Sequence, residues 1–93
     1  MEQRACLEHE FAIADKALNT AYKQALTKLP PPPDDRPDQK QRLILSQRAW
    51  LNYRNAHCAY EALQGGNLTW QAIFSLICET DLTADRIKWL KNQ

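Results

Sequence analysis

The stretch LSQRAWLNYRNAHC, residues 45–58, decides the fold, because it places a tryptophan, two arginines, a tyrosine and a cysteine on one predicted helix. Gln47, Trp50 and Arg54 follow one another at spacings of three and four residues, so they share one stripe of that helix, beside its apolar stripe. A guanidinium one turn from an indole can stack on it, which contributes about 0.5–1 kcal/mol at an exposed site. The stretch therefore predicts either a polar seam inside a helical bundle or a face that binds a ligand.

The preceding segment offers partners for this stripe. Asn19 and Tyr22 are three residues apart on a predicted helix and lie at the same general depth of the bundle. Buried amides and guanidinium groups are usually structural unless they line a pocket. We therefore favour a seam that fixes helix register, with Arg54 hydrogen-bonded to carbonyl groups or to Asn19, over a ligand-binding face.

Two interruptions divide the chain into three helical segments. The first, LPPPPDDRPD at residues 29–38, contains four consecutive prolines, which cannot continue a helix and favour an extended connector. The second is GGN, in which Gly65 and Gly66 supply positions for a positive φ. Asn67, or the threonine two residues later, can cap the helix that follows, and Asp35 or Asp38 can cap the helix after the prolines.

Apolar residues recur at helical spacing in each segment and predict which side of each helix faces the core. In the first segment they are Leu7, Phe11, Ala14, Leu18, Ala21, Ala25 and Leu29. In the second segment they are Leu45, Ala49, Tyr53, Ala56, Tyr60 and Leu63. In the third segment they are Ile73, Ile77, Ala84 and Ile87, with Trp70, Phe74, Leu76 and Leu90 beside them. Polar residues of the first segment, among them Glu8, Glu10 and Asp15, are interpreted as a solvated face.

No stretch alternates with a period of two for long enough to predict a strand. We expect an all-α, up-down-up three-helix bundle with helices at about residues 2–28, 38–64 and 68–91. Thr80, Asp81 and Thr83 are cap-forming residues, so the third helix is expected to kink near them.

The composition is that of a globular protein with one domain. The chain has 93 residues, of which 44% are hydrophobic and 25% are charged, and this length leaves no room for a second core. A formal net charge of +1, with basic residues interleaved among acidic ones, provides no field to recruit nucleic acid. No apolar run approaches the roughly 18 residues of a membrane span. We expect a single domain over residues 1–93, with no nucleic-acid partner and no membrane-spanning segment.

Neither catalysis nor a bound cofactor is predicted. The chain has no glycine-rich phosphate loop, no HExxH motif and no recognisable Ser–His–Asp or Cys–His arrangement. Zinc ligand types gather toward one end of the predicted bundle at Cys6, His9, His57 and Cys58. However, His57 and Cys58 are consecutive and diverge by about 100° around a helix, so both reach one ion only with a distorted backbone. We expect no enzyme activity, no metal and no cofactor.

Four patterns occur in order along the chain, after Cys6. They are ADKALNTAY (14–22), QRAWLNYRNAHC (47–58), GGN (65–67) and CETDLTADRIKWL (78–90). Together they resemble the LprI-type lysozyme inhibitors, a large family of small secreted bacterial helical proteins that mostly lack an assigned function. The resemblance covers nearly the whole chain except the proline connector. Family members usually carry a further cysteine upstream of the position of Cys6, and this chain has neither that cysteine nor a lipobox cysteine.

The resemblance implies a disulfide between Cys58 and Cys78, which would staple the bundle across the GGN turn. In an antiparallel pair of the first two helices, Cys6 and Cys58 lie at similar distances from the proline turn, so a Cys6–Cys58 bridge is the alternative. We favour Cys58–Cys78. The resemblance also implies export to the periplasm or the cell exterior. The N-terminus MEQRACLEHE is too polar for a signal peptide, so the export signal is expected to lie outside this chain.

The function implied by the resemblance is inhibition of lysozyme, as for the founding mycobacterial lipoprotein of the family. We expect a protein partner, either a lysozyme or another cell-wall hydrolase. The candidate contacts are Arg36 on the proline connector and the turn formed by Gly65, Gly66 and Asn67, whose backbone N–H groups can approach a partner closely. The competing hypothesis is a structural or interaction module of the envelope with an unrelated protein partner.

Overall fold

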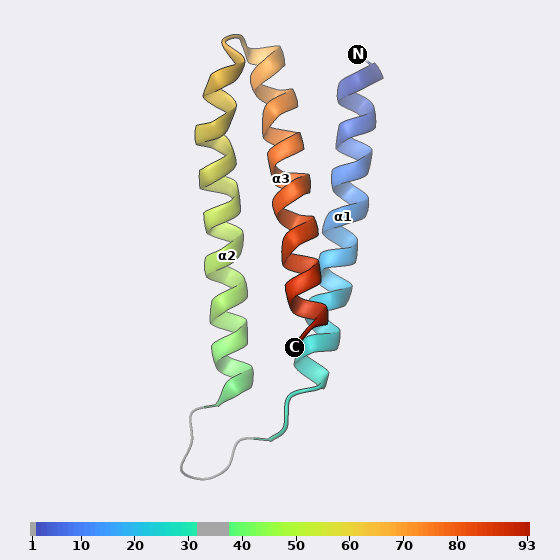
Figure 1. Cartoon of the computed structure of the whole chain (residues 1–93), viewed down its shortest axis with the longest axis vertical. Helices are drawn as coiled ribbons and strands as arrows, with labels where there is room; N and C mark the ends of the chain where they lie inside the picture. Colours follow the sequence, from blue (N-terminus) through green and yellow to red (C-terminus); the bar gives the residue numbers. More distant parts are fainter. Residues whose placement is uncertain (1, 32–37) are drawn as a thin grey trace.

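The computed structural model describes residues 2–31 and 38–93, which form three long α-helices and one short 3₁₀ helix (Figure 1). The helices are α1 (Glu2–Thr27), α2 (Gln39–Glu61), η1 (Ala62–Gly65) and α3 (Leu68–Lys91). The prediction of an all-α three-helix bundle is confirmed. The predicted kink in the third helix is wrong, because α3 is continuous through Thr80–Thr83. None of the helices in the described part of the chain is long and apolar enough to cross a membrane.

The three long helices form an open layer rather than a closed triangle. α3, the last helix of the chain, lies between α1 and α2 and packs against both, whereas α1 and α2 scarcely touch (Figure 1). The Cα atoms accordingly extend over 54 × 22 × 14 Å. The turn between α2 and α3 lies at the same end of the layer as the N-terminus of the chain. This arrangement leaves a space between α1 and α2, alongside α3.

Side-chain caps begin α2 and α3, at two of the positions that the sequence offered. The side chain of Asp38 accepts a hydrogen bond from the backbone N–H of Lys40 at 3.0 Å. That of Asn67 accepts one from the N–H of Trp70 at 3.0 Å. Each cap satisfies a donor at a helix N-terminus that has no partner within the helix. The other predicted cap, Asp35, lies outside the described residues.

The two glycines of the turn between α2 and α3 are required for different reasons. Gly66 has a φ of 77°, which L-residues with a side chain rarely adopt. Gly65 is required because the backbone of the next helix passes close to it: a Cβ atom there would lie 2.6 Å from the backbone nitrogen of Gln71. The prediction of a positive φ is therefore confirmed for Gly66 alone. The close approach at Gly65 brings the start of α3 against the end of α2.

The core lies mainly between α1 and α3. The predicted inner stripe of the first helix is correct in its centre, where Leu18, Ala21 and Ala25 are buried together with Leu90 of α3. The two alanines leave room for α3 to approach α1 closely. Partly buried apolar residues surround this cluster: Tyr22, Leu43, Trp50, Leu51 and Ile87.

The predicted inner stripe of the second helix is wrong. Leu45, Tyr53, Tyr60 and Leu63 are 48%, 53%, 69% and 64% exposed, and Ala49 and Ala56 between them are exposed as well. The buried residues of α2 are instead Gln47, Arg54 and Cys58, on the opposite side of the helix. α2 is apolar on its outer side, so hydrophobic periodicity alone gave it the wrong rotation. Leu63 follows α2 in η1. We call the six exposed apolar residues, five in α2 and Leu63 in η1, the outer stripe of α2.

The third helix also differs in part from the prediction. Ile73 and Leu90 are buried, as is Thr83, whereas Ile77 and Ala84 are exposed. Thr80 donates its hydroxyl to the carbonyl of Leu76, four residues earlier, at 2.8 Å. This bond keeps the Thr80 side chain within its own helix, so Thr80 does not cap a new one.

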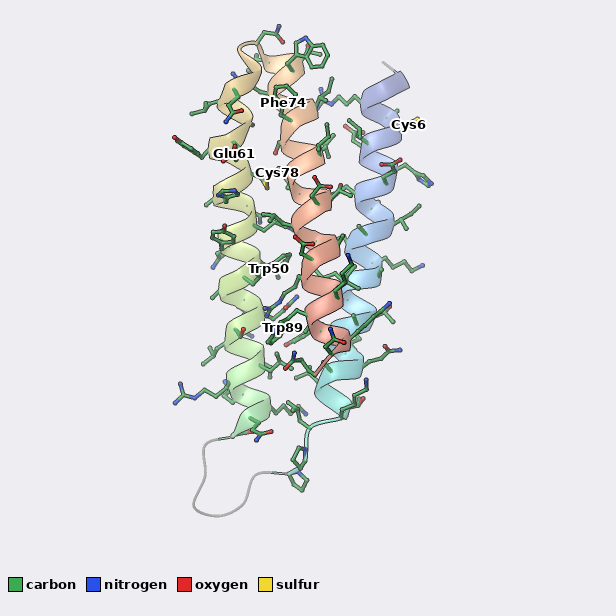
Figure 2. All side chains as sticks on the ribbon, viewed as in Figure 1. Cys6, Trp50, Glu61, Phe74, Cys78 and Trp89 are labelled. Atoms are coloured by element: carbon green, nitrogen blue, oxygen red, sulfur yellow. A yellow bond between two sulfur atoms is a disulfide. The ribbon has the colours of Figure 1, made fainter. Side chains whose placement is uncertain are left out.

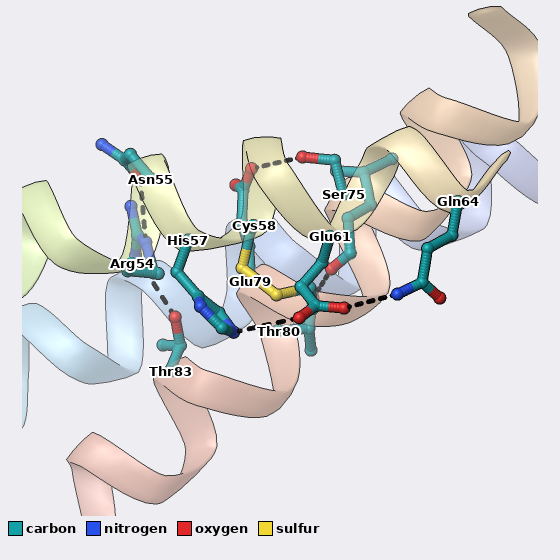
Figure 3. The surroundings of a disulfide bond; sticks show 12 residues. Arg54, Asn55, His57, Cys58, Glu61, Gln64, Ser75, Glu79, Thr80 and Thr83 are labelled. Atoms are coloured by element: carbon teal, nitrogen blue, oxygen red, sulfur yellow. Dashed lines mark hydrogen bonds and ion pairs between the residues drawn. A yellow bond between two sulfur atoms is a disulfide. The ribbon is translucent and has the colours of Figure 1, made fainter. Parts of the chain in front are cut away.

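A disulfide joins α2 to α3 between Cys58 and Cys78 (Figure 3). The two Cα atoms are 5.5 Å apart, within the usual range for a disulfide. Cys58 is fully buried, whereas Cys6 is a free, exposed cysteine on α1. The favoured pairing is confirmed, and the alternative Cys6–Cys58 pairing is wrong.

Replacement of both Cys58 and Cys78 by alanine should lower the free energy of unfolding by about 3 kcal/mol. The disulfide closes a loop between residues that are 20 positions apart, and the chain-entropy model assigns about 3 kcal/mol to a loop of this size. Urea unfolding followed by circular dichroism measures the change. Cys6→Ser is the control, because an exposed free thiol should change stability by less than about 0.5 kcal/mol. A double variant as stable as the control would contradict a structural role for the bridge.

Candidate functional site

A buried arginine connects all three helices. Arg54 of α2 is only 6% exposed. Its Nη1 donates to Oδ1 of Asp15 on α1 at 3.3 Å and to Oγ1 of Thr83 on α3 at 3.2 Å. Its Nε donates to Oδ1 of the neighbouring Asn55 at 3.1 Å, and Figure 3 shows the bonds to Asn55 and Thr83. The guanidinium therefore holds α2 at a fixed rotation relative to the other two helices.

Aromatic rings complete the surroundings of this guanidinium. Its central carbon lies 5.1 Å from the ring centroid of Phe11 on α1 and 5.6 Å from that of Trp50 on α2. Attraction between a cation and the π face of a ring is stronger when the cation is desolvated. The side chain of Asp15 is 47% exposed, so water screens the ion pair between Asp15 and Arg54. The rings and hydrogen bonds, more than the ion pair, offset the cost of burying Arg54.

A second arginine extends the polar cluster along α3. Nε of Arg86 donates to Oε1 of Gln47 at 3.0 Å, and its Nη2 donates to Oγ of Ser46 at 3.1 Å. The Arg86 guanidinium lies 4.3 Å from the ring of Trp89 and 5.6 Å from that of Trp50. Burial lowers the pKa of Arg86 from its ordinary value, because desolvation disfavours the charged form. Trp50 thus contacts both guanidinium groups, and its side chain lies between α2 and α3 with that of Trp89 (Figure 2).

The structure brings Gln47, Trp50 and Arg54 together on the inner side of α2. Asn19 is exposed and is not among the hydrogen-bond partners of Arg54 within the described residues. The expected partners of Arg54, carbonyl groups of the backbone or Asn19, are therefore wrong, because its partners are the side chains of Asp15, Asn55 and Thr83. The carboxylate on α1 that Arg54 contacts is Asp15, for which the sequence predicts a solvated face.

Sequence reasoning also missed Thr83 and Arg86 as members of this cluster. A signal for them was present, because the two residues are three positions apart and therefore share a side of a helix. The sequence predicts a helix cap at Thr83 and places Arg86 in the CETDLTADRIKWL pattern and among the basic residues of the third helix. The spacing within one helix does not show that polar groups of α2 need partners on α3.

A groove of about 640 Å³ lies between α1 and α2. It is open because these helices scarcely touch. Asn19 and Tyr22 line it from α1, whereas Gln47 and Arg54 line it from α2. The remaining lining residues are Asp15, Leu18, Ile44, Arg48, Leu51 and Asn55. The groove offers hydrogen-bond donors and apolar surface, which suits binding rather than proton transfer.

A different surface surrounds the turn between α2 and α3. We call residues 63–74 the hairpin end. Leu63, Leu68, Trp70 and Phe74 are exposed there, and Leu68 is 82% exposed. The first N–H groups of an α-helix have no partner within it. Asn67 accepts from the N–H of Trp70 with its side chain and from that of Gln71 with its carbonyl, so the N–H groups of Leu68 and Thr69 remain directed out of the end of α3.

The residues predicted from sequence to contact a protein partner lie in two parts of the chain, the turn before α3 and the proline connector. Gly65, Gly66 and Asn67 form the turn of the hairpin end, with Gly66 and Asn67 exposed. The side-chain oxygen of Asn67 already accepts a hydrogen bond as a helix cap, so its backbone is more available to a partner than its side-chain amide. Arg36 lies outside the described residues. Within the described ranges, no group of three or more histidine, cysteine, aspartate or glutamate side chains could hold a metal ion, and the sulfur of Cys58 is bonded to Cys78.

Comparison with known proteins gives a family match and one distant relative. The family model of the lysozyme inhibitor LprI matches residues 1–90. The chain is 37% identical over 60 residues to YecT of Escherichia coli (strain K12), described as an uncharacterized protein, and the match covers 59% of this chain and 37% of YecT. The match thus spans well under half the length of that relative. No solved structure matches the chain.

Substitution of the buried arginine should destabilise the bundle strongly. Arg54→Ala removes the bonds to α1 and α3 and leaves Thr83 without its donor, so it should lower the free energy of unfolding by about 2–4 kcal/mol. Thr83→Val, which keeps the shape and removes one acceptor, should cost about 1 kcal/mol. Chemical unfolding of both variants measures these values. An Arg54→Ala variant that unfolds like the native chain would show that the guanidinium does not fix the rotation of α2.

Proposed function

Because the chain belongs to the LprI lysozyme inhibitor family, we propose that it is a periplasmic or secreted bacterial binding protein that inhibits a lysozyme or another cell-wall hydrolase. The observation that carries this proposal is the family match over residues 1–90. The family is one of inhibitors rather than enzymes, in keeping with a protein that acts by docking. The partner is accordingly another protein.

The disulfide supports the proposed location. A bridge such as Cys58–Cys78 forms and persists in oxidising compartments, which include the bacterial periplasm and the cell exterior. Cys58 is fully buried within the layer of helices. Cys78 is half-buried, so the bridge is packed on its α2 side.

The hairpin end is the proposed inhibitory element. Lysozyme binds its substrate in a cleft with two carboxyl groups beside the scissile bond, so an inhibitor needs a projecting element that carries donors or positive charge. The N-terminus of α3 has both features, because its free N–H groups lie at the positive end of the helix dipole. The exposed side chains of Leu68 and Trp70 supply apolar contact around these donors.

The groove between α1 and α2 is less suited to this role. It is concave, and the substrate cleft of a lysozyme is concave as well, so the two surfaces do not fit together. Arg54, the most buried charge of the groove, already donates to Asp15 and Thr83. Arg36 on the proline connector is a second proposed contact with the lysozyme cleft. Its support is that a guanidinium can pair with a carboxylate.

Lysozyme inhibition can be tested directly with the purified protein in its disulfide-bonded form. Chicken-type, goose-type and invertebrate-type lysozymes are each mixed with the protein, and lysis of a bacterial cell suspension is followed by turbidity. We expect at least one type to be inhibited at micromolar protein. If none is inhibited, the proposal of a lysozyme inhibitor fails, and the interaction module of the envelope becomes the better hypothesis.

The contribution of the hairpin end is tested by Leu68→Glu. A glutamate at the first position of α3 is compatible with the helix dipole, so the fold should be retained. The same negative charge would face the carboxylates of the lysozyme cleft, so the inhibitor concentration needed for half inhibition should rise at least about tenfold. Ile13→Glu is the matched control, because Ile13 is exposed on α1, away from the hairpin end. Equal inhibition by both variants would exclude the hairpin end as the inhibitory element.

A further inference from the structure

The outer stripe of α2 is an apolar helix face without a partner in the described structure. It consists of Leu45, Ala49, Tyr53, Ala56, Tyr60 and Leu63, all of which are exposed. From Leu45 to Tyr60 the α-helix rises by about 22 Å, and Leu63 follows in η1. Contiguous apolar surface of this kind on a soluble protein usually marks an interaction site. We propose that the outer stripe binds the outer stripe of a second copy of the chain, so that the protein forms an antiparallel dimer through α2.

The spacing of the stripe is that of a helix that pairs with another helix. Ala49, Tyr53, Ala56, Tyr60 and Leu63 are separated by four, three, four and three residues. This alternation keeps one side of a helix facing a partner helix over several turns. The core-facing side of α2 has no such apolar repeat, because the polar residues Gln47 and Arg54 are buried there. The repeat therefore belongs to a contact outside the monomer.

The sizes of the side chains make the stripe complementary to itself. Small and large residues alternate along it as Ala49, Tyr53, Ala56 and Tyr60. When two such helices run in opposite directions, one alignment places Tyr53 opposite Ala56 of the second copy and Ala49 opposite Tyr60. Every ring then faces a small residue, which is the condition for close packing without voids. The same patch is used on both copies, as a two-fold axis requires.

The charges near the stripe favour the antiparallel direction. The stripe itself carries no charged residue, whereas Arg42 and Arg48 lie close to its beginning. In a parallel pair each arginine would lie beside the same arginine of the second copy, and the two like charges would repel each other. In the antiparallel alignment given above, Arg48 lies level with Glu61 at the C-terminal end of α2 of the second copy, whereas Arg42 lies beyond that end. The last turn of α2 has no basic residue and contains Glu61, and the carbonyl end of a helix attracts a cation.

One tyrosine of the stripe is already held in place in the monomer. The ring of Tyr53 stacks on that of His57 on the same helix, with centroids 5.2 Å apart and an angle of 18° between the planes. An ordered side chain loses less entropy on binding. A contact through one helix face is nevertheless small for a protein interface, because stable complexes bury at least about 1,000 Å² in total. The dimer is therefore expected to be weak and to depend on protein concentration.

Sedimentation equilibrium from micromolar to millimolar protein tests the dimer. The experiment uses Cys6→Ser throughout, because the exposed thiol of Cys6 could join two chains covalently, and keeps the Cys58–Cys78 bridge intact. The Cys6→Ser protein should associate reversibly to a dimer. Addition of Ala56→Glu, at the centre of the stripe, should raise the dissociation constant at least about tenfold. Ala12→Glu is the matched control, because it makes the same change at an exposed alanine of α1 and should leave the dimer unchanged.

A mixing experiment shows whether the stripe recognises itself. In the proposed alignment, residue 56 of one copy lies opposite residue 53 of the other, so the two copies of residue 56 are offset by about 4.5 Å along the helices. An equimolar mixture of Ala56→Glu and Ala56→Lys should therefore form a dimer, although each variant alone should remain monomeric. A monomeric Cys6→Ser protein at millimolar concentration would overturn the proposal. A dimer that withstands Ala56→Glu would overturn it as well, as would a mixture that stays monomeric.

Discussion

The guanidinium of Arg54 is the constraint on which the rest of the structure depends. A charged group of this size can be buried only where hydrogen-bond acceptors and polarisable rings surround it. Here the acceptors come from Asp15 on α1 and Thr83 on α3, and the rings from Phe11 and Trp50. α2 must therefore turn its polar side inward. The disulfide, four residues further along α2, fixes the same rotation from the same side of the helix.

This inward rotation has consequences on both sides of α2. On the inner side, Gln47 becomes the partner of Arg86, and Trp50 lies against both arginines. On the outer side, the alanine and tyrosine repeat is exposed to solvent. Polar burial and apolar exposure in α2 are thus two results of one rotation. The apolar core is correspondingly displaced to the contact between α1 and α3, where Leu18 and Leu90 are buried.

The sequence predicted the elements of the fold better than their rotation. The prolines, the glycine turn and the caps at Asp38 and Asn67 are local signals, and the helices begin and end close to the expected residues. The rotation of α1 was predicted correctly in its centre, where its apolar residues are buried. That of α2 was not, because periodicity cannot distinguish a stripe that faces the core from one that faces outward. In the site, the polar members of α2 were found from their spacing. Their pairing was not, because it depends on contacts between residues about 30–40 positions apart, and the spacing of Thr83 and Arg86 shows only that these two share a side of α3.

The central position of α3 also determines when the molecule can fold. α1 and α2 have little contact with each other, and each packs against a helix that follows both of them in the sequence. Helices with so few mutual contacts gain too little buried surface to be stable as a pair. α1 and α2 therefore stay unfolded until residues 68–91 are present. The molecule is expected to fold in one cooperative step that waits for α3, rather than helix by helix along the chain.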